Sequence, residues 1–216
     1  MNIAIDHNNE GIIFLEKGQN DMALLEFKKA AQLMYSITQE LKNNKKTGSE
    51  TQQQPKSLTL CTSSKNPIAT ENSFIRSTPI LMAGSQEPTD SCQCTIESAT
   101  VLLNMALTYH IDSQTPNCMK GATQSAIALY DMSYSLGLQV NEDTRSHHII
   151  LTALNNLGQL YYELGDYNKS RLYLEDLSTY VMFLGPGEEE NAVRDRHEFL
   201  LNAMVLRNPN TSAGAA

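Results

Sequence analysis

This sequence lacks a long apolar run and an N-terminal export signal. No stretch reaches the ~20 apolar residues that a helix needs to cross a bilayer. The N-terminus, MNIAIDHNNEG, has no basic stretch followed by an apolar run, so we expect no signal peptide. The predicted location is intracellular, in the cytoplasm or the nucleus.

Basic residues are also scarce: 16 Lys and Arg stand against 24 Asp and Glu, for a net charge of -8. A protein that follows nucleic-acid phosphates needs a basic face, and anionic lipid surfaces attract basic segments. We therefore expect neither nucleic acid nor a membrane as a partner.

Motifs for metal, phosphate or catalysis are missing as well. Gly185-Pro186-Gly187 is not followed by the Lys-Ser/Thr of a phosphate-binding loop, and no catalytic unit is recognisable around His147 and His148. We expect no enzyme activity, no cofactor, no metal and no small-molecule substrate. Free thiols, rather than a disulfide framework or a zinc site, are predicted for the four cysteines, Cys61, Cys92, Cys94 and Cys118.

Apolar residues recur at helical spacing through most of the chain and predict an all-α fold. Residues 1–42 are predicted to form a helical hairpin that turns at Gly18. The next segment, 43–94, is rich in Ser, Thr and Gln and contains prolines, which predicts a disordered insert. Two further hairpins and a capping helix at 188–206 are predicted within 95–206, followed by a disordered tail at 207–216.

Smaller features refine these boundaries. Thr95 is a suitable N-cap for the helix after the insert, and Gly137 is expected to end a later helix. Within the insert, SFIRSTPILMAG is more apolar than its surroundings. It lies extended along the helices, or it forms an apolar patch in a loop, and Pro79 limits it to an edge strand.

The three predicted hairpins share one pattern of small and large residues. Gly158 lies in the middle of a predicted helix, where glycine costs roughly 1 kcal/mol relative to alanine. We expect a second helix to approach its backbone closely. The equivalent packing positions are Gly11, Phe14, Ala23, Phe27, Ala30, Ala106, Tyr109, Ala126, Tyr130, Leu154, Leu157, Gly158, Tyr161 and Leu174.

This pattern resembles the tetratricopeptide repeat (TPR), a helix-turn-helix of about 34 residues. Leu154 takes the place of the usual Trp, the second repeat needs extra residues between its helices, and Met182 replaces the closing Pro of the third. The resemblance implies three stacked antiparallel hairpins with a concave, protein-binding groove. The order of hairpin, polar insert, LNMAL, LNNLGQ and final helix also resembles a group of TPR-like proteins common in diatoms, which implies no biochemical function.

Asparagines occupy one equivalent position in the three first helices, which the resemblance places on the groove. An Asn amide both donates and accepts, so it can pair with the backbone of an extended peptide. Alternatively, these are ordinary polar positions that solvate the surface. The Lys and Arg of a clamp for a C-terminal carboxylate are absent. The predicted groove residues are Asn8, Asn9, Ile12, Leu103, Asn104, Leu107, Asn155, Asn156 and Gln159.

Two functions follow as hypotheses. The first is a non-enzymatic protein–protein interaction module, a scaffold or adaptor that binds a peptide or helix of a protein partner in its groove. The alternative is a structural subunit whose helices are permanently buried in a larger complex. A helical enzyme with an unrecognised site would require a pocket holding several perturbed titratable groups.

Overall fold

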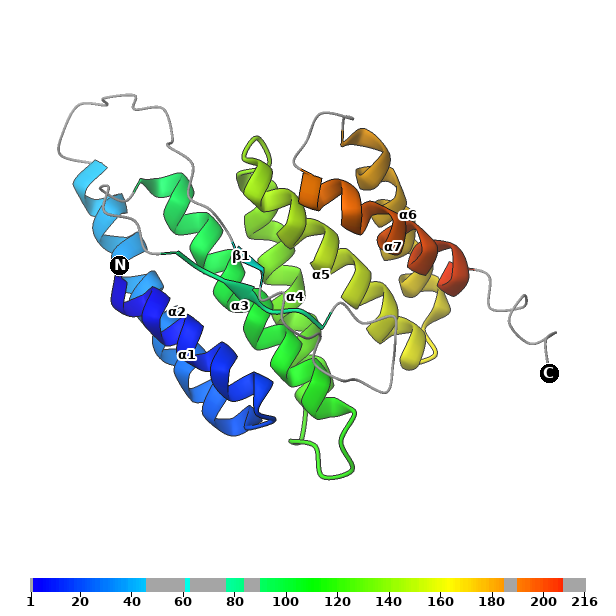
Figure 1. Cartoon of the computed structure of the whole chain (residues 1–216), viewed down its shortest axis with the longest axis horizontal. Helices are drawn as coiled ribbons and strands as arrows, with labels where there is room; N and C mark the ends of the chain where they lie inside the picture. The colour runs from blue at the N-terminus through cyan, green and yellow to red at the C-terminus, as the bar shows by residue number, and fades with distance from the viewer. Residues whose placement is uncertain (1, 46–60, 63–76, 84–89, 185–189, 208–216) are drawn as a thin grey trace.

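The computed structural model describes residues 2–45, 61–62, 77–83, 90–184 and 190–207. In these ranges the chain forms helices packed sequentially in antiparallel pairs, as Figure 1 shows, and the all-α prediction is confirmed. The helices are α1 (Asn2–Glu16), α2 (Asn20–Lys45), α3 (Ser91–Ser113), α4 (Ala122–Gln139), α5 (Thr144–Glu163), α6 (Tyr167–Phe183) and α7 (Glu190–Arg207). None of the described helices is both long and apolar enough to span a bilayer.

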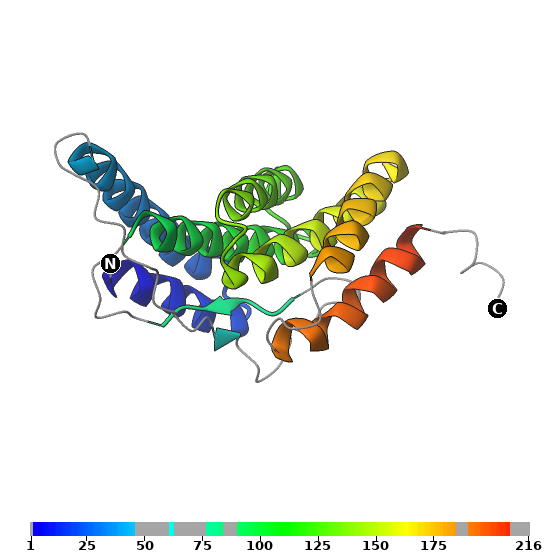
Figure 2. The same cartoon turned by 90° about the horizontal axis from the view of Figure 1, so that it is seen from above.

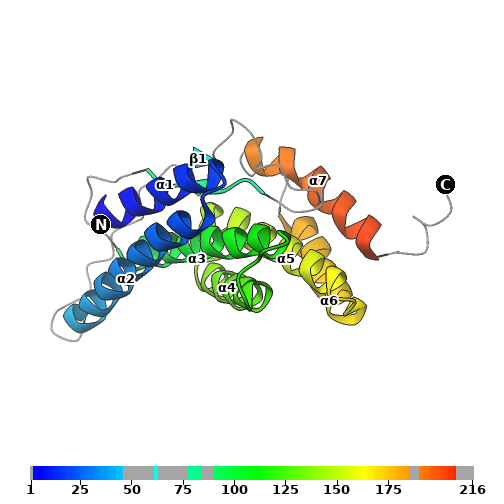
Figure 3. The same ribbon diagram turned by 90° about the horizontal axis from the view of Figure 1, so that it is seen from below.

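Three hairpins, α1–α2, α3–α4 and α5–α6, stack on one another, and α7 packs against α5 and α6. Two short strands, β1 (Cys61–Thr62) and β2 (Ile80–Leu81), pair antiparallel, with Cys61 opposite Leu81. Figures 2 and 3 show α1, the strands and α7 on one side of α3 and α5, with α4 and α6 on the other. On that side, the strands and α7 lie beside α3 and α5 although they belong to none of the three hairpins.

Glycines allow the closest approaches between the helices of a hairpin. A Cβ atom added to Gly158 would lie 2.6 Å from Leu174 Cδ2, and one added to Gly11 would lie 2.7 Å from Phe27 Cε1. Both distances are shorter than carbon atoms tolerate. Ser170 Oγ also donates a hydrogen bond of 2.8 Å to the Gly158 carbonyl. The predicted close approach at Gly158 is confirmed, and the first hairpin repeats it.

Two predicted helix boundaries are wrong. The helix after the insert begins at Ser91 rather than Thr95, because the Asp90 side chain accepts a 2.6 Å hydrogen bond from Gln93 N and caps the helix earlier. α4 continues through Gly137 to Gln139. A Cβ at Gly137 would lie 2.9 Å from Ile150 Cγ1. This glycine therefore admits the neighbouring helix α5 rather than ending α4.

The predicted disordered insert, 43–94, also needs correction. α2 extends to Lys45, α3 begins at Ser91, and residues 77–83 lie extended against the helices with Ile80 and Met82 buried. Apolar side chains in this segment fill space between hairpins, which offsets the entropy of ordering it. The predictions for 46–60, 63–76, 84–89 and 208–216 fall outside the described residues.

Candidate functional site

Five asparagines lie along the side of α1, α3 and α5 that faces β2 and α7. We call them the asparagine row: Asn8, Asn9, Asn104, Asn155 and Asn156. Asn9 is half-buried, and the other four are at most 1% exposed. A buried amide without hydrogen bonds would be strongly unfavourable, so the partners of these side chains define the chemistry of the site.

Asn9 binds both main-chain polar groups of Met82. Its Nδ2 donates to the Met82 carbonyl at 2.8 Å, and its Oδ1 accepts from the Met82 N–H at 3.0 Å. A carboxamide carries the same donor and acceptor as a peptide group. The Asn9 side chain therefore takes the place of a neighbouring β-strand.

Asn104 repeats this arrangement two residues earlier in the segment. Its Oδ1 accepts from the Ile80 N–H at 2.9 Å, and its Nδ2 donates to the Ile80 carbonyl at 2.9 Å. Asn8 contacts both Asn104 and Ile80. Its Oδ1 accepts a hydrogen bond from Asn104 Nδ2 at 2.9 Å, and its Nδ2 lies 3.3 Å from the Ile80 carbonyl oxygen. Neighbouring hydrogen bonds in a buried site polarise and strengthen one another.

The side chains of Ile80 and Met82 enter two different parts of the core. Ile80 is fully buried in the cluster that α3, α4 and α5 form around Leu103 and Ile149. Met82 belongs to the cluster of the first hairpin and α3, with Ile5 and Ile12. Residues 77–83 thus connect the first hairpin to the second and third through alternate side chains.

The third hairpin uses its asparagines differently. Asn156 Nδ2 donates to the Tyr130 hydroxyl at 3.0 Å, and Asn155 Nδ2 donates to Asn156 Oδ1 at 3.0 Å. Asn202, on α7, donates to Asn155 Oδ1 at 2.9 Å. Burial raises the pKa of the Tyr130 hydroxyl well above its ordinary value, and the Asn156 hydrogen bond only partly opposes this. This end of the row binds side chains, among them one from α7.

The predicted groove is therefore covered in the folded chain. Its apolar residues Ile12, Leu103 and Leu107 are buried, as is Gln159, whose Nε2 donates to Glu163 at 2.9 Å. The row pairs with peptide groups and side chains of the same chain, and it does not solvate an open surface. Sequence reasoning missed residues 77–83 as the occupant, although the apolar character of SFIRSTPILMAG was the signal.

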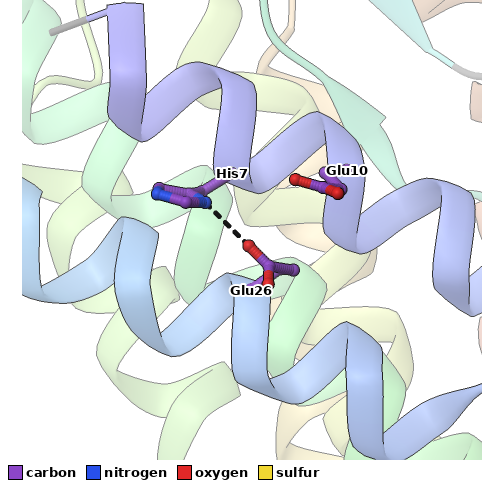
Figure 4. Close-up of side chains that lie close together, drawn as sticks. All are labelled: His7, Glu10 and Glu26. Carbon is purple, nitrogen blue, oxygen red and sulfur yellow. Dashed lines mark hydrogen bonds and ion pairs between the residues drawn. The ribbon is translucent and has the colours of Figure 1, made fainter.

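A second polar cluster lies between α1 and α2, and Figure 4 shows its three side chains close together. The metal-binding atoms of His7, Glu10 and Glu26 all lie within 4.8 Å of one another. His7 Nδ1 is 2.7 Å from Glu26 Oε2, and Lys29 Nζ donates to Glu26 Oε1 at 2.6 Å. The Lys29 hydrogen bond is the largest effect holding the pKa of Glu26 below its usual value, and the His7 hydrogen bond adds to it.

His7, Glu10 and Glu26 offer the kinds of ligand atoms that coordinate a divalent cation. The sequence did not predict that these three residues come together. The Lys29 ammonium already pairs with the Glu26 carboxylate and His7 forms a hydrogen bond with it, so a cation would have to displace both. His7 and Glu10 stand where the repeat pattern expects large apolar residues, and that departure was the available signal. We interpret the cluster as a hydrogen-bond network in which His7 of α1 contacts Glu26 of α2, while Lys29 pairs with Glu26 within α2.

Three cysteines are free thiols, as predicted: Cys92 is half-buried, Cys94 is buried and Cys118 is exposed. Burial raises the pKa of the Cys92 and Cys94 thiols, so they remain protonated and unreactive at neutral pH. The Cys61 side chain lies outside the described part of the chain.

Comparison of the whole chain with family models, curated proteins and solved structures finds no match.

Proposed function

We propose that this protein is a TPR-like interaction module that binds an extended peptide of a protein partner along the asparagine row. The observation that carries the proposal is the pairing of Asn9 and Asn104 with both main-chain groups of Met82 and Ile80. Two side chains on different hairpins bind alternate residues of one extended segment. Such spacing matches the two-residue period of a β-strand.

The chemistry of this surface suits a peptide better than a helix. A helix satisfies its own main-chain N–H and C=O groups, so it would leave the amides of Asn9 and Asn104 without partners. An extended peptide offers these groups along one edge at every second residue. Main-chain hydrogen bonds supply affinity in such complexes, and pockets for alternate side chains supply specificity.

The test is whether the row binds a peptide supplied as a separate molecule. A chain with Ile80→Ser and Met82→Ser keeps the asparagines but weakens the hold on its own segment. We expect a fluorescein-labelled peptide with the sequence of residues 77–83, STPILMA, to bind this variant saturably, as measured by fluorescence anisotropy.

A matched variant adds Asn9→Ala and Asn104→Ala and should lose this binding. Circular dichroism checks that both variants are helical. If the serine variant is only partly folded, the peptide should raise its helical signal and its melting temperature, because a ligand of the folded state stabilises that state. Absence of both anisotropy change and thermal shift would refute peptide binding along the row.

The alternative, a structural subunit of a larger complex, is favoured by exposed apolar residues on α7. Leu201, Met204 and Val205 are 46%, 67% and 41% exposed and occupy adjacent positions on the helix surface. A subunit that buries this side of α7 would self-associate or precipitate without its partner. Sedimentation of the wild type and of a triple serine variant at these positions tests this: a monomer in both excludes association through α7.

A further inference from the structure

We infer that residues 77–83 are a displaceable ligand of the chain's own binding site, and that the partner is an extended peptide with apolar side chains at two alternate positions. The inference rests on the proposed function and adds the class of ligand and its competitor. The contacts that this segment makes show which main-chain groups and side chains the site accepts.

The main-chain contacts set the first requirement for a ligand. The N–H groups of Ile80 and Met82 both donate to asparagine side chains. A partner residue at either position must therefore have an amide hydrogen, which excludes proline there. Pro79 precedes the first of these positions, so proline is accepted before the recognised pair.

The side chains set the second requirement. Ile80 and Met82 are 0% and 3% exposed, whereas Leu81, between them, is half-buried and lies opposite Cys61 of β1. The two buried positions need apolar side chains of this size, because a smaller or polar residue leaves a cavity or a buried polar group. The middle position packs only partly against the core of the first hairpin, so it tolerates a wider choice. The recognised pattern is two apolar residues separated by one residue that is less restricted.

The energetics of the segment permit displacement. The segment gains the contacts described above, but ordering its backbone opposes them residue by residue. A partner peptide of the same pattern makes the same contacts and replaces them one for one. Because the chain's own segment competes for the site, the apparent dissociation constant for the partner equals the intrinsic constant divided by the fraction of chains whose site is open.

The experiment compares the wild type with the Ile80→Ser, Met82→Ser variant in binding the labelled STPILMA peptide. We expect both to bind, the wild type at least about tenfold more weakly, because its own segment occupies the site. Hydrogen exchange at the Ile80 and Met82 amides of the wild type should accelerate when peptide is added. A peptide N-methylated at its isoleucine should bind the variant at least about tenfold more weakly.

Each other outcome identifies what has failed. Binding by the variant but not by the wild type at any peptide concentration would leave the proposed function standing and overturn displacement. Equal binding of both, with unchanged exchange, would also overturn it, because the peptide would then bind elsewhere. Equal binding of STPILMA and of a peptide with serines at the two apolar positions would overturn the ligand class. No binding by either chain would refute the proposed function itself.

Discussion

The first and third hairpins share their packing but use their asparagines differently. In both, a glycine of the first helix lies against a large side chain of the second, at Gly11 and at Gly158. Both also carry adjacent asparagines at equivalent positions. In the first hairpin, Asn9 binds the main chain of the 77–83 segment. In the third, Asn156 binds Tyr130, and Asn155 accepts from Asn202 of α7.

This difference between the first and third hairpins shows that repeated packing residues and repeated polar residues determine different things. Small and large residues at fixed spacing determine how helices of one hairpin pack, since steric fit depends on local neighbours. A repeated polar residue determines only that a buried donor and acceptor need partners. Which partner arrives depends on segments outside the repeat, here β2 at one end and α7 at the other.

The largest expected effect tests the shared part of the comparison. Replacing Gly158 with Leu, or Gly11 with Leu, forces side-chain atoms into the space of Leu174 or Phe27. We expect each change to lower the free energy of unfolding by about 3 kcal/mol, at the upper end for overpacked cores. Urea unfolding followed by circular dichroism measures the loss.

The control for this pair is Arg171→Leu on the exposed side of α6, which should leave stability nearly unchanged. Similar losses at Gly11 and Gly158 would support equivalent packing in the two hairpins. An unchanged unfolding midpoint for Gly158→Leu would mean that α5 and α6 do not approach as closely as described.

The second prediction tests where the hairpins differ. Asn104→Ala leaves the Ile80 N–H without its acceptor, at about 1–3 kcal/mol for a buried group. We expect the segment to detach, so hydrogen exchange should accelerate at the Ile80 and Met82 amides and little in α7. Asn156→Ala should instead destabilise the packing around Tyr130 and leave exchange at Ile80 and Met82 nearly unchanged.

The two variants serve as controls for each other, because each removes the same carboxamide from an equivalent position. Hydrogen exchange read by mass spectrometry on peptides covering 77–83 and 197–207 distinguishes them. If both variants accelerate exchange in both regions equally, the row acts as one cooperative unit and the division described here is wrong.

Sequence reasoning predicted the hairpins because their determinants are local. The spacing of Gly158 from Leu154, and of Phe27 from Ala23, expresses helix periodicity and close packing within one repeat. The early start of α3 was missed because Asp90 caps it in preference to Thr95, and both residues are good caps. At Gly137 the sequence was ambiguous, because glycine is expected both where a helix ends and where another helix approaches closely.

The site was only partly predictable for a different reason. The amide chemistry of Asn9 and Asn104 indicated pairing with an extended backbone, and the structure contains that pairing. The sequence did not identify residues 77–83 as the partner, because contacts between segments 73 and 24 residues apart leave no local periodicity. His7 and Glu26, which contact each other across 19 residues, were missed on the same grounds.

The smallest expected effect concerns pH and belongs to the first hairpin alone, because Leu154 and Tyr173 stand in the third where His7 and Glu26 stand in the first. The pKa of Glu26 is lowered from 4.5, first by Lys29, so the folded state favours its charged form. This contribution is present above 4.5 and is lost as the pH falls through the lowered folded value. Glu26→Gln should therefore reduce the free energy of unfolding near neutral pH by under about 1 kcal/mol, because its main partner, Lys29, is exposed to solvent. The gap between variant and wild type should close below pH 4.5 in urea titrations, whereas a gap independent of pH would show that the Glu26 charge contributes nothing to stability.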